Sequence, residues 1–179
     1  MSDIPNQKRR RAKERPGPYR WAVQVFFLAI CLSAALSLAS EVSLGGAGAA
    51  AAGLVLAVFI GLGILFDIIG VAVTAADPRP FHSMAAHKEP GAKEALMLLR
   101  NAGRVSSVCN DVVGDICGIV SGTTTAVIVV RLQAAFSLPE SVLLSVAVTA
   151  LVSGLTIGGK AMGKTVALNK STSVVYWVG

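Results

Sequence analysis

Charged residues are scarce in this chain of 179 residues. Only 15% of the residues are Asp, Glu, Lys or Arg, whereas 54% are hydrophobic and the mean hydropathy is +0.67. A typical soluble domain carries about 25% charged residues. The scarcity of charge therefore excludes an ordinary soluble domain and indicates a membrane protein.

Cysteine and histidine are also few. Three cysteines, an odd number, exclude a framework of paired disulfides, and Cys31, Cys109 and Cys117 all fall in apolar stretches. We expect them to pack as small apolar side chains. The only two histidines, His82 and His87, are spaced so that they would lie on different faces of a helix. Neither residue type gives a strong metal-binding pattern.

Long stretches with little or no charge define the fold class. A helix needs about 20 apolar residues to cross a hydrocarbon core of about 30 Å. The chain therefore predicts an all-α, polytopic membrane protein whose four transmembrane helices cover about residues 21–40, 48–76, 105–130 and 141–159. A cleaved signal peptide is the alternative for the first stretch, but its apolar core would run for only about 7 to 15 residues.

Basic residues collect on one side of this predicted topology. Every Lys and Arg except Arg131 lies before the first helix, between the second and third, or after the fourth. The positive-inside rule then places both termini of a multi-pass cell membrane protein in the cytoplasm. Residues 1–18 form a basic tail that we expect to be disordered, and residues 19–179 form the transmembrane domain. The run KRRRAKER could bind nucleic acid, but beside a membrane helix its expected partners are membrane lipids.

The connection between the second and third helices has an amphipathic pattern. Pro78 and Pro80 are expected to end the second helix, and Pro90 to begin a new segment. The sequence "EPGAKEALMLLRNAGR" then alternates leucines and alanines with charged residues at helical spacing. It predicts a juxtamembrane amphipathic helix on the inner membrane surface.

Three aspartates fall inside the predicted spans. A carboxylate near the bilayer centre costs about 2.5 to 3.5 kcal/mol, so Asp67, Asp111 and Asp115 are candidate functional residues. Asp111 and Asp115 are four positions apart on one helix face, where two like charges repel unless a cation binds between them. With the amide oxygen of Asn110 and backbone carbonyl oxygens at close helix contacts, they suit a hard divalent cation such as Mg²⁺. The alternative is that these acids are protonated or hydrogen-bonded structural residues.

Glycines recur at four-residue steps in the same region. Asn110 and Gly114 are followed by Gly118 and Gly122, and the fourth stretch contains Gly154 and Gly158. Such small-xxx-small patterns let two helix backbones approach closely in a membrane. We expect these faces to mediate a homodimer.

From about Leu54 to Gly179 the chain resembles the transmembrane domain of the CorB/CorC and cyclin-M family of magnesium and cobalt transporters. The resemblance is carried by "LMLLRNAGR" before the third helix, "CNDVVGD" at its start and "GGKAMGKTVALNKSTSV" at the end of the fourth. It implies transport of Mg²⁺, Co²⁺ or another divalent cation, and a cation site that carries over to Asn110, Asp111, Gly114 and, more loosely, Asp67. Lys160 stands where the family has an acidic residue, and no regulatory nucleotide-binding domains follow in this sequence.

Two other functions are consistent with the residues. One is a small membrane scaffold or assembly subunit without transport activity, which the glycine patterns and the departures from the family favour. The other is an intramembrane aspartyl protease built on Asp67 and Asp115, whose typical Gly-x-Gly-Asp pattern is here Val-Val-Gly-Asp. Four spans leave little room to enclose a peptide, so we expect no enzymatic activity.

Overall fold

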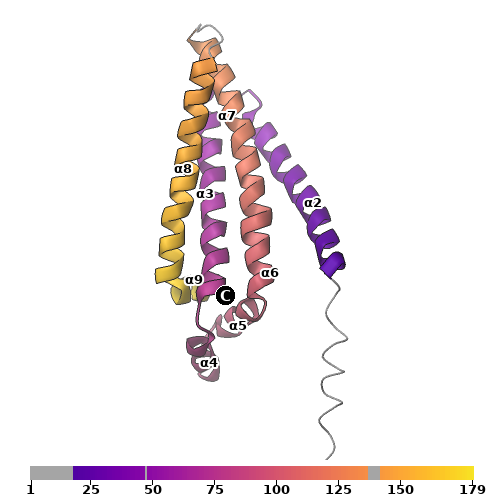
Figure 1. Cartoon of the computed structure of the whole chain (residues 1–179), viewed down its shortest axis with the longest axis vertical. Coiled ribbons are helices and arrows are strands. Elements are labelled where there is room, and N and C mark those ends of the chain that lie inside the picture. Colours follow the sequence, from indigo (N-terminus) through magenta and orange to yellow (C-terminus); the bar gives the residue numbers. More distant parts are fainter. Residues whose placement is uncertain (1–17, 47, 137–141) are drawn as a thin grey trace, which may run out of the picture.

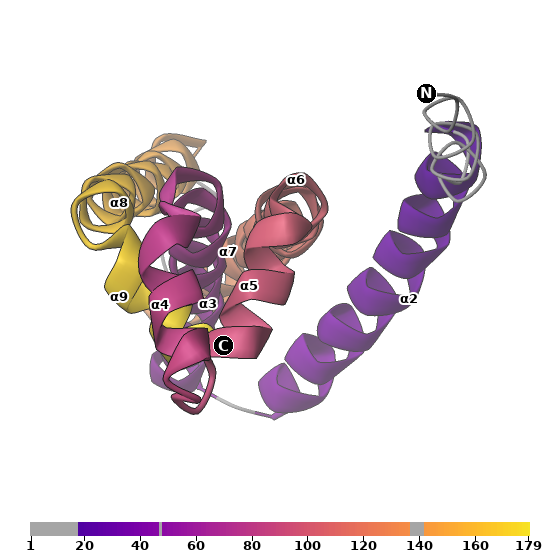
Figure 2. The same cartoon turned by 90° about the horizontal axis from the view of Figure 1, so that it is seen from below.

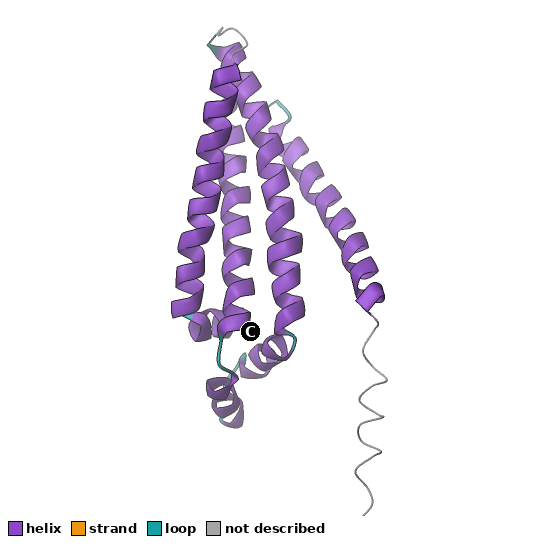
Figure 3. Ribbon diagram, viewed as in Figure 1, coloured by secondary structure: helices purple, strands orange, loops and turns teal. Residues whose placement is uncertain are grey.

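The computed structural model describes residues 18–46, 48–136 and 142–179, so the predicted basic tail lies outside it except for its last residue. Every regular element in these residues is a helix, and four helices are long and apolar enough to cross a membrane. Figure 3 shows this all-helical architecture. The predicted all-α, four-span membrane fold is therefore confirmed. The long elements are α2 (Pro18–Leu44), α3 (Ala49–Ala75), α7 (Asp115–Ala135) and α8 (Val142–Asn169).

Helix α3 is the central element of the bundle. It packs against α7 and α8, and α2 lies beside α7 on the outer side (Figures 1 and 2). The third span is built from three consecutive segments, which are α6 (Ala102–Ser106), the π-helix η1 (Ser107–Gly114) and α7. A π-helix is rare and often occurs at functional positions, so η1 marks a region of special interest.

Several helix ends differ from the sequence-based prediction, since α2 runs from Pro18 to Leu44 and α7 continues to Ala135. The fourth helix was expected to end near residue 159, but α8 continues to Asn169. The third begins at Ala102 rather than at about residue 105. The physical reason is that a lysine such as Lys160 ends a hydrophobic run without ending a helix, because lysine has high helix propensity. The first charged residue was used to predict where the helix leaves the membrane. The helix itself ends where its backbone hydrogen bonds end.

Both ends of the described chain lie at the same end of the bundle. Figure 1 shows the start of α2 and the C-terminal residue at the bottom, as an even number of spans requires. Arg131, the exception to the one-sided basic pattern, lies at the opposite end, where its Nη2 donates a hydrogen bond of 2.6 Å to the Leu44 carbonyl. Which of the two ends faces the cytoplasm stays a prediction from the charge pattern.

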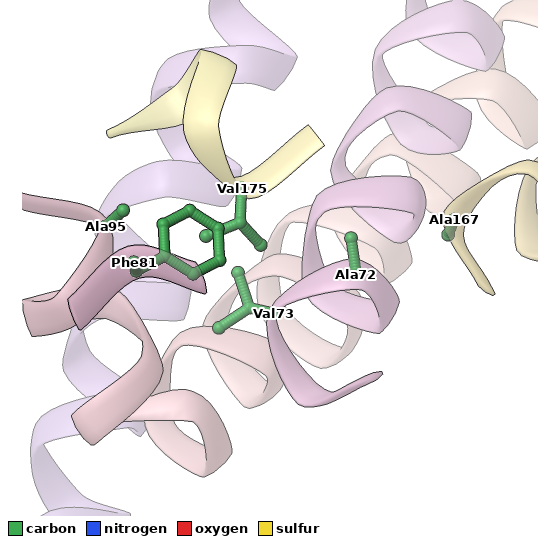
Figure 4. Close-up of a cluster of buried hydrophobic side chains, with 6 residues drawn as sticks. All are labelled: Ala72, Val73, Phe81, Ala95, Ala167 and Val175. Atoms are coloured by element: carbon green, nitrogen blue, oxygen red, sulfur yellow. The ribbon is translucent and has the colours of Figure 1, made fainter. Parts of the chain in front are cut away.

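Three short helices form a cap at the end of the bundle that carries the termini. They are α4 (Pro78–Ala86), α5 (Ala92–Arg100) and α9 (Ser171–Val178). The predicted amphipathic helix is α5, which buries Ala95 together with Phe81 of α4 and Val175 of α9 against Val73 of α3 (Figure 4). Pro78 ends α3 as expected and also begins α4, since proline fits the first turn of a helix.

Candidate intramembrane polar site

One face of α3 is buried along its whole length. The buried positions recur every three or four residues, which is the spacing of one helix face, and they are Ala52, Leu56, Phe59, Gly63, Asp67 and Gly70. In this series Asp67 is the polar exception, with 6% of its surface exposed. It is the one charged residue that is buried within the described part of the chain.

The π-helix η1 lies opposite Asp67 on α3. Asn110 of η1 fits into the space left by Gly70, because a Cβ added to Gly70 would collide with the Asn110 side chain. Two turns along α3, a Cβ on Gly63 would lie 3.2 Å from Cys117 Cβ and 4.0 Å from the Gly114 carbonyl oxygen. These two glycines let η1 and the start of α7 approach α3 on either side of Asp67.

Two buried oxygen atoms at this contact lack hydrogen-bond partners. Asp67 Oδ2 and Asn110 Oδ1 are both inaccessible and unpaired within the described residues. The Asn110 amide nitrogen donates to Ser106 Oγ at 3.3 Å, so the amide group is oriented while its oxygen is left free. Buried polar atoms are almost always paired, because an unpaired one costs about 1 to 3 kcal/mol. Two such atoms from facing helices could each accept a group that supplies positive charge or a proton.

Helix α8 brings a basic side chain to the same interior. A Cβ on Gly163 would lie 2.9 Å from Ile68 Cγ1, so α8 packs closely on α3. This contact leaves Lys160 half-buried, with its ammonium nitrogen 3.5 Å from the position of a Cβ on Gly114. Lys160 therefore points toward η1 from the side opposite α2. The site thus combines a carboxylate from α3, an amide oxygen from η1 and an ammonium group from α8.

The five residues predicted to bind a metal fall into two groups. Asp67, Asn110 and Gly114 lie at the contact between α3 and η1, whereas Asp111 and Asp115 are exposed on the surface of η1 and α7. Asp111 accepts a hydrogen bond of 2.9 Å from Ser107 Oγ. No cluster of three His, Cys, Asp or Glu residues is present within residues 18–46, 48–136 and 142–179. The pairing of Asp111 with Asp115 around one cation stays a prediction, and within the bundle Asp67 and Asn110 form the buried pair.

Lys160 is the residue of this site that the sequence-based prediction missed. It was counted among the basic residues after the fourth span, because the uncharged run ends just before it. The signal that could have found it is the spacing of Gly159 and Gly163, a small-xxx-small pair on either side of the lysine. In the structure both of these glycines do pack against α3, on Ile64 and Ile68.

The glycines that were expected to form close helix contacts are mostly open in this chain. Nothing lies within 4 Å of a Cβ on Gly118, Gly122, Gly154 or Gly158. Between α7 and α8 there is instead a cavity of about 180 Å³, here called the α7–α8 groove. Its lining is rich in hydroxyl groups, from Ser121, Thr125, Thr149, Ser153 and Thr156. Ser121 is buried, and its Oγ has no partner within the described residues.

Comparisons with models of known protein families, with curated proteins and with solved structures find no match to this chain. The resemblance to the CorB/CorC and cyclin-M family therefore stays a prediction that depends on the sequence motifs.

Proposed function

We propose that this protein binds a divalent cation inside the membrane and transports it, without enzymatic activity, in the manner of the family that it resembles. Mg²⁺ is the expected ion, and Co²⁺ or another divalent cation is the alternative. The observation that carries the proposal is the pair of buried, unpaired oxygens, Asp67 Oδ2 and Asn110 Oδ1, on facing helices.

The chemistry of these groups supports a hard cation. Carboxylate, amide and backbone carbonyl oxygens are the ligands that Mg²⁺ prefers, and Mg²⁺ usually keeps several of its own waters, so few protein ligands are needed. Asp67 supplies the negative charge, Asn110 a neutral oxygen, and the Gly114 carbonyl lies at the same contact. A carboxylate retained at this depth in an apolar bundle is expected to serve an ion pathway.

Lys160 gives the site a second state. Its ammonium group lies beside Gly114 and makes no hydrogen bond to Asp67 Oδ2, which is unpaired within the described residues. A divalent cation that binds Asp67 would be repelled by this ammonium, so binding requires Lys160 to move away. The lysine stem has four flexible carbons and can carry the charged head toward the membrane surface. We therefore propose that Lys160 moves away from η1 when a metal ion binds Asp67.

Thermal melting in detergent tests the proposal directly. We expect Mg²⁺, Mn²⁺ or Co²⁺ to raise the melting temperature of the wild-type protein, since a ligand stabilises the state that binds it. Asp67→Asn should abolish this rise. Lys160→Gln should shift the response to about tenfold lower metal concentration, which corresponds to about 1.4 kcal/mol, because the competing charge is removed.

Asp115→Asn is the matched control for the loss of one carboxylate. Asp115 is exposed and lies away from the buried pair, so this variant should keep the full metal response if Asp67 and Asn110 form the site. A response that depends on Asp115 and not on Asp67 would move the site to the outer face of the helix. A wild-type melting temperature that ignores all three ions would refute the proposal.

A homodimeric scaffold is the second candidate function. The α7–α8 groove supports it. Its open glycines leave room for another membrane helix, and the unpaired Ser121 Oγ could form a hydrogen bond with that helix. We propose that a second copy of this chain occupies the groove. A dimer is compatible with transport, so the metal response separates the scaffold function from the transport function.

The cell membrane, with both termini in the cytoplasm, is the proposed location. It is supported by the basic residues at the end of the bundle where both termini lie. A reporter fused after Gly179 should be cytoplasmic, and one inserted between α7 and α8 should be outside. Cytoplasmic labelling of the second reporter would contradict this orientation.

A further inference from the structure

An apolar cleft lies between α3 and α9, at the end of the bundle that carries the basic residues. Its volume is about 360 Å³. One wall comes from Leu65 and Ile69, one turn apart on α3, and the other comes from Val174, Trp177 and Val178, which share one face of α9. The cleft is separate from the polar site, because Asp67 and Asn110 do not line it.

The cleft opens toward the surface of the molecule rather than into its core. Trp177 is 89% exposed and Leu65 is 49% exposed, although both are large apolar side chains. Val175, about 100° around α9 from Val174, is fully buried in the cap, so α9 is held in place while its cleft-lining face stays open. Tryptophan is enriched at membrane interfaces, where its ring is amphipathic. This exposure and the position of α9 beside a spanning helix place the cleft at the edge of the bilayer.

The rim of the cleft is polar and basic, in contrast to its apolar walls. Lys170 lines it and is also the residue that precedes the first turn of α9, where its side chain makes no capping hydrogen bond. Ser173 adds a hydroxyl group from that first turn. The N-terminus of a helix carries a partial positive charge and favours phosphate. A cationic side chain, a hydroxyl group and a helix N-terminus therefore meet at one end of an apolar cleft.

We infer that this cleft binds one anionic phospholipid of the inner leaflet. The phosphate lies at Lys170, Ser173 and the start of α9, and one acyl chain lies between the walls formed by α3 and α9. The occupant is a lipid rather than a free phosphate, because most of the lining is apolar and only its rim is polar. Bound lipid links α9 to α3 and so stabilises the attachment of the cap to the bundle.

The experiment uses the full chain, purified in detergent and stripped of lipid. Phosphatidylglycerol, phosphatidylcholine, diacylglycerol and glycerol 3-phosphate are added separately, and bound lipid is measured by native mass spectrometry alongside the melting temperature. We expect phosphatidylglycerol to bind and to raise the melting temperature most, and glycerol 3-phosphate to have no effect. Equal binding of phosphatidylglycerol and phosphatidylcholine, or an equal response to glycerol 3-phosphate, would overturn the inference.

Two pairs of variants locate the lipid. Lys170→Gln should weaken phosphatidylglycerol binding about fivefold, the change expected for loss of about 1 kcal/mol near an anionic headgroup. Lys164→Gln removes the same charge from an exposed position outside the cleft and should have little effect. Leu65→Trp should fill the cleft and reduce binding of the acyl chain, whereas Leu54→Trp, exposed elsewhere on α3, should not. Equal effects within either pair would show that the lipid is bound elsewhere.

The outcome does not depend on the proposed cation transport. Lipid binding is measured without metal, and Asp67→Asn should leave it unchanged. Loss of lipid binding in Asp67→Asn would mean that the cleft and the polar site are not independent, and would overturn the assignment to Lys170 and its neighbours.

Discussion

The α3–η1 contact and the α7–α8 groove are both rich in glycine, yet they pack differently. At the first, Gly63 and Gly70 are occupied by neighbouring side chains, so each glycine is needed for the contact within this chain. At the second, Gly118 and Gly122 meet nothing within 4 Å. Glycines on one helix face, seven residues apart in the first region and four apart in the second, thus correspond to a formed contact in one case and an open surface in the other.

Unpaired polar atoms also differ between the two regions. The closed contact contains Asp67 Oδ2 and Asn110 Oδ1, a charged and a neutral oxygen that suit an ion. The open groove contains Ser121 Oγ among other hydroxyl groups, which suit a hydrogen bond from another helix. Close packing thus positions the oxygens of the proposed ion site, whereas looser packing leaves the α7–α8 groove open to the proposed second copy of the chain.

The largest expected effect distinguishes a closely packed glycine of α3 from an exposed glycine of the same helix. Gly63→Leu should destabilise the protein by about 1 to 3 kcal/mol, because a leucine side chain does not fit against Cys117 and the Gly114 carbonyl. Gly61→Leu is the control, since Gly61 is exposed and a Cβ there meets nothing. Melting in detergent checks both, and equal losses would mean that α3 does not pack on α7 as described.

A substitution in the α7–α8 groove should change the association of the proposed dimer rather than the stability of the monomer. Gly122→Leu should weaken the proposed dimer at least tenfold, which is about 1.4 kcal/mol, by filling the surface that a second copy would approach. The melting temperature of the monomer should change little, since no side chain lies near Gly122. Analytical ultracentrifugation in detergent measures the dimer, and an unchanged dissociation constant would remove the groove from the interface.

A double-mutant cycle tests whether Lys160 acts on Asp67. Asp67→Asn and Lys160→Gln each remove one of the two charges, while the double variant removes both. We expect a coupling energy of about 1 kcal/mol in the absence of metal, since groups in one polar network are not additive. Chemical or thermal unfolding of the four proteins provides the measurement. Strictly additive effects would mean that the two charges do not interact.

The smallest expected effect concerns the packing of α2. Ser40 Oγ and Thr124 Oγ1 form a buried hydrogen bond of 3.3 Å between α2 and α7. Hydrogen bonds between membrane helices contribute about 0.6 kcal/mol on average, so Ser40→Ala should lower stability by about that amount. Ser43→Ala is a suitable control, because Ser43 bonds only to the Ala39 carbonyl of its own helix. A loss well above 1 kcal/mol would show that α2 depends on this bond more than on its apolar contacts.

Much of the fold followed from the sequence because the bilayer imposes its own length scale. A spanning helix must be apolar for about 20 residues, and that run is visible without any knowledge of packing. The central parts of all four spans were predicted on this basis, and α5 was predicted from its amphipathic pattern. The helix α9 was not, since eight residues at the end of the chain carry no spanning signal.

The candidate site was predicted only in part. The sequence identified Asp67, Asn110 and Gly114, because polar and small residues are conspicuous in an apolar run. It grouped them with Asp111 and Asp115, which the fold turns outward. Neighbouring residues on a helix lie about 100° apart, so when Asn110 faces α3 the next residue must face elsewhere. Sequence spacing fixes this angle between residues and leaves open which of them points inward.

By itself the sequence determined the class of the protein, the approximate spans and the one-sided placement of the basic residues. The tertiary structure decided which oxygens are buried and which glycines have a neighbour in the space where a Cβ would lie. It also decided that Lys160 points toward η1. The physical reason is that hydrophobicity sets how deep a helix lies in a membrane but not how it is rotated about its axis. Rotation depends on side-chain fit between helices, such as Asn110 against Gly70 and Gly163 against Ile68.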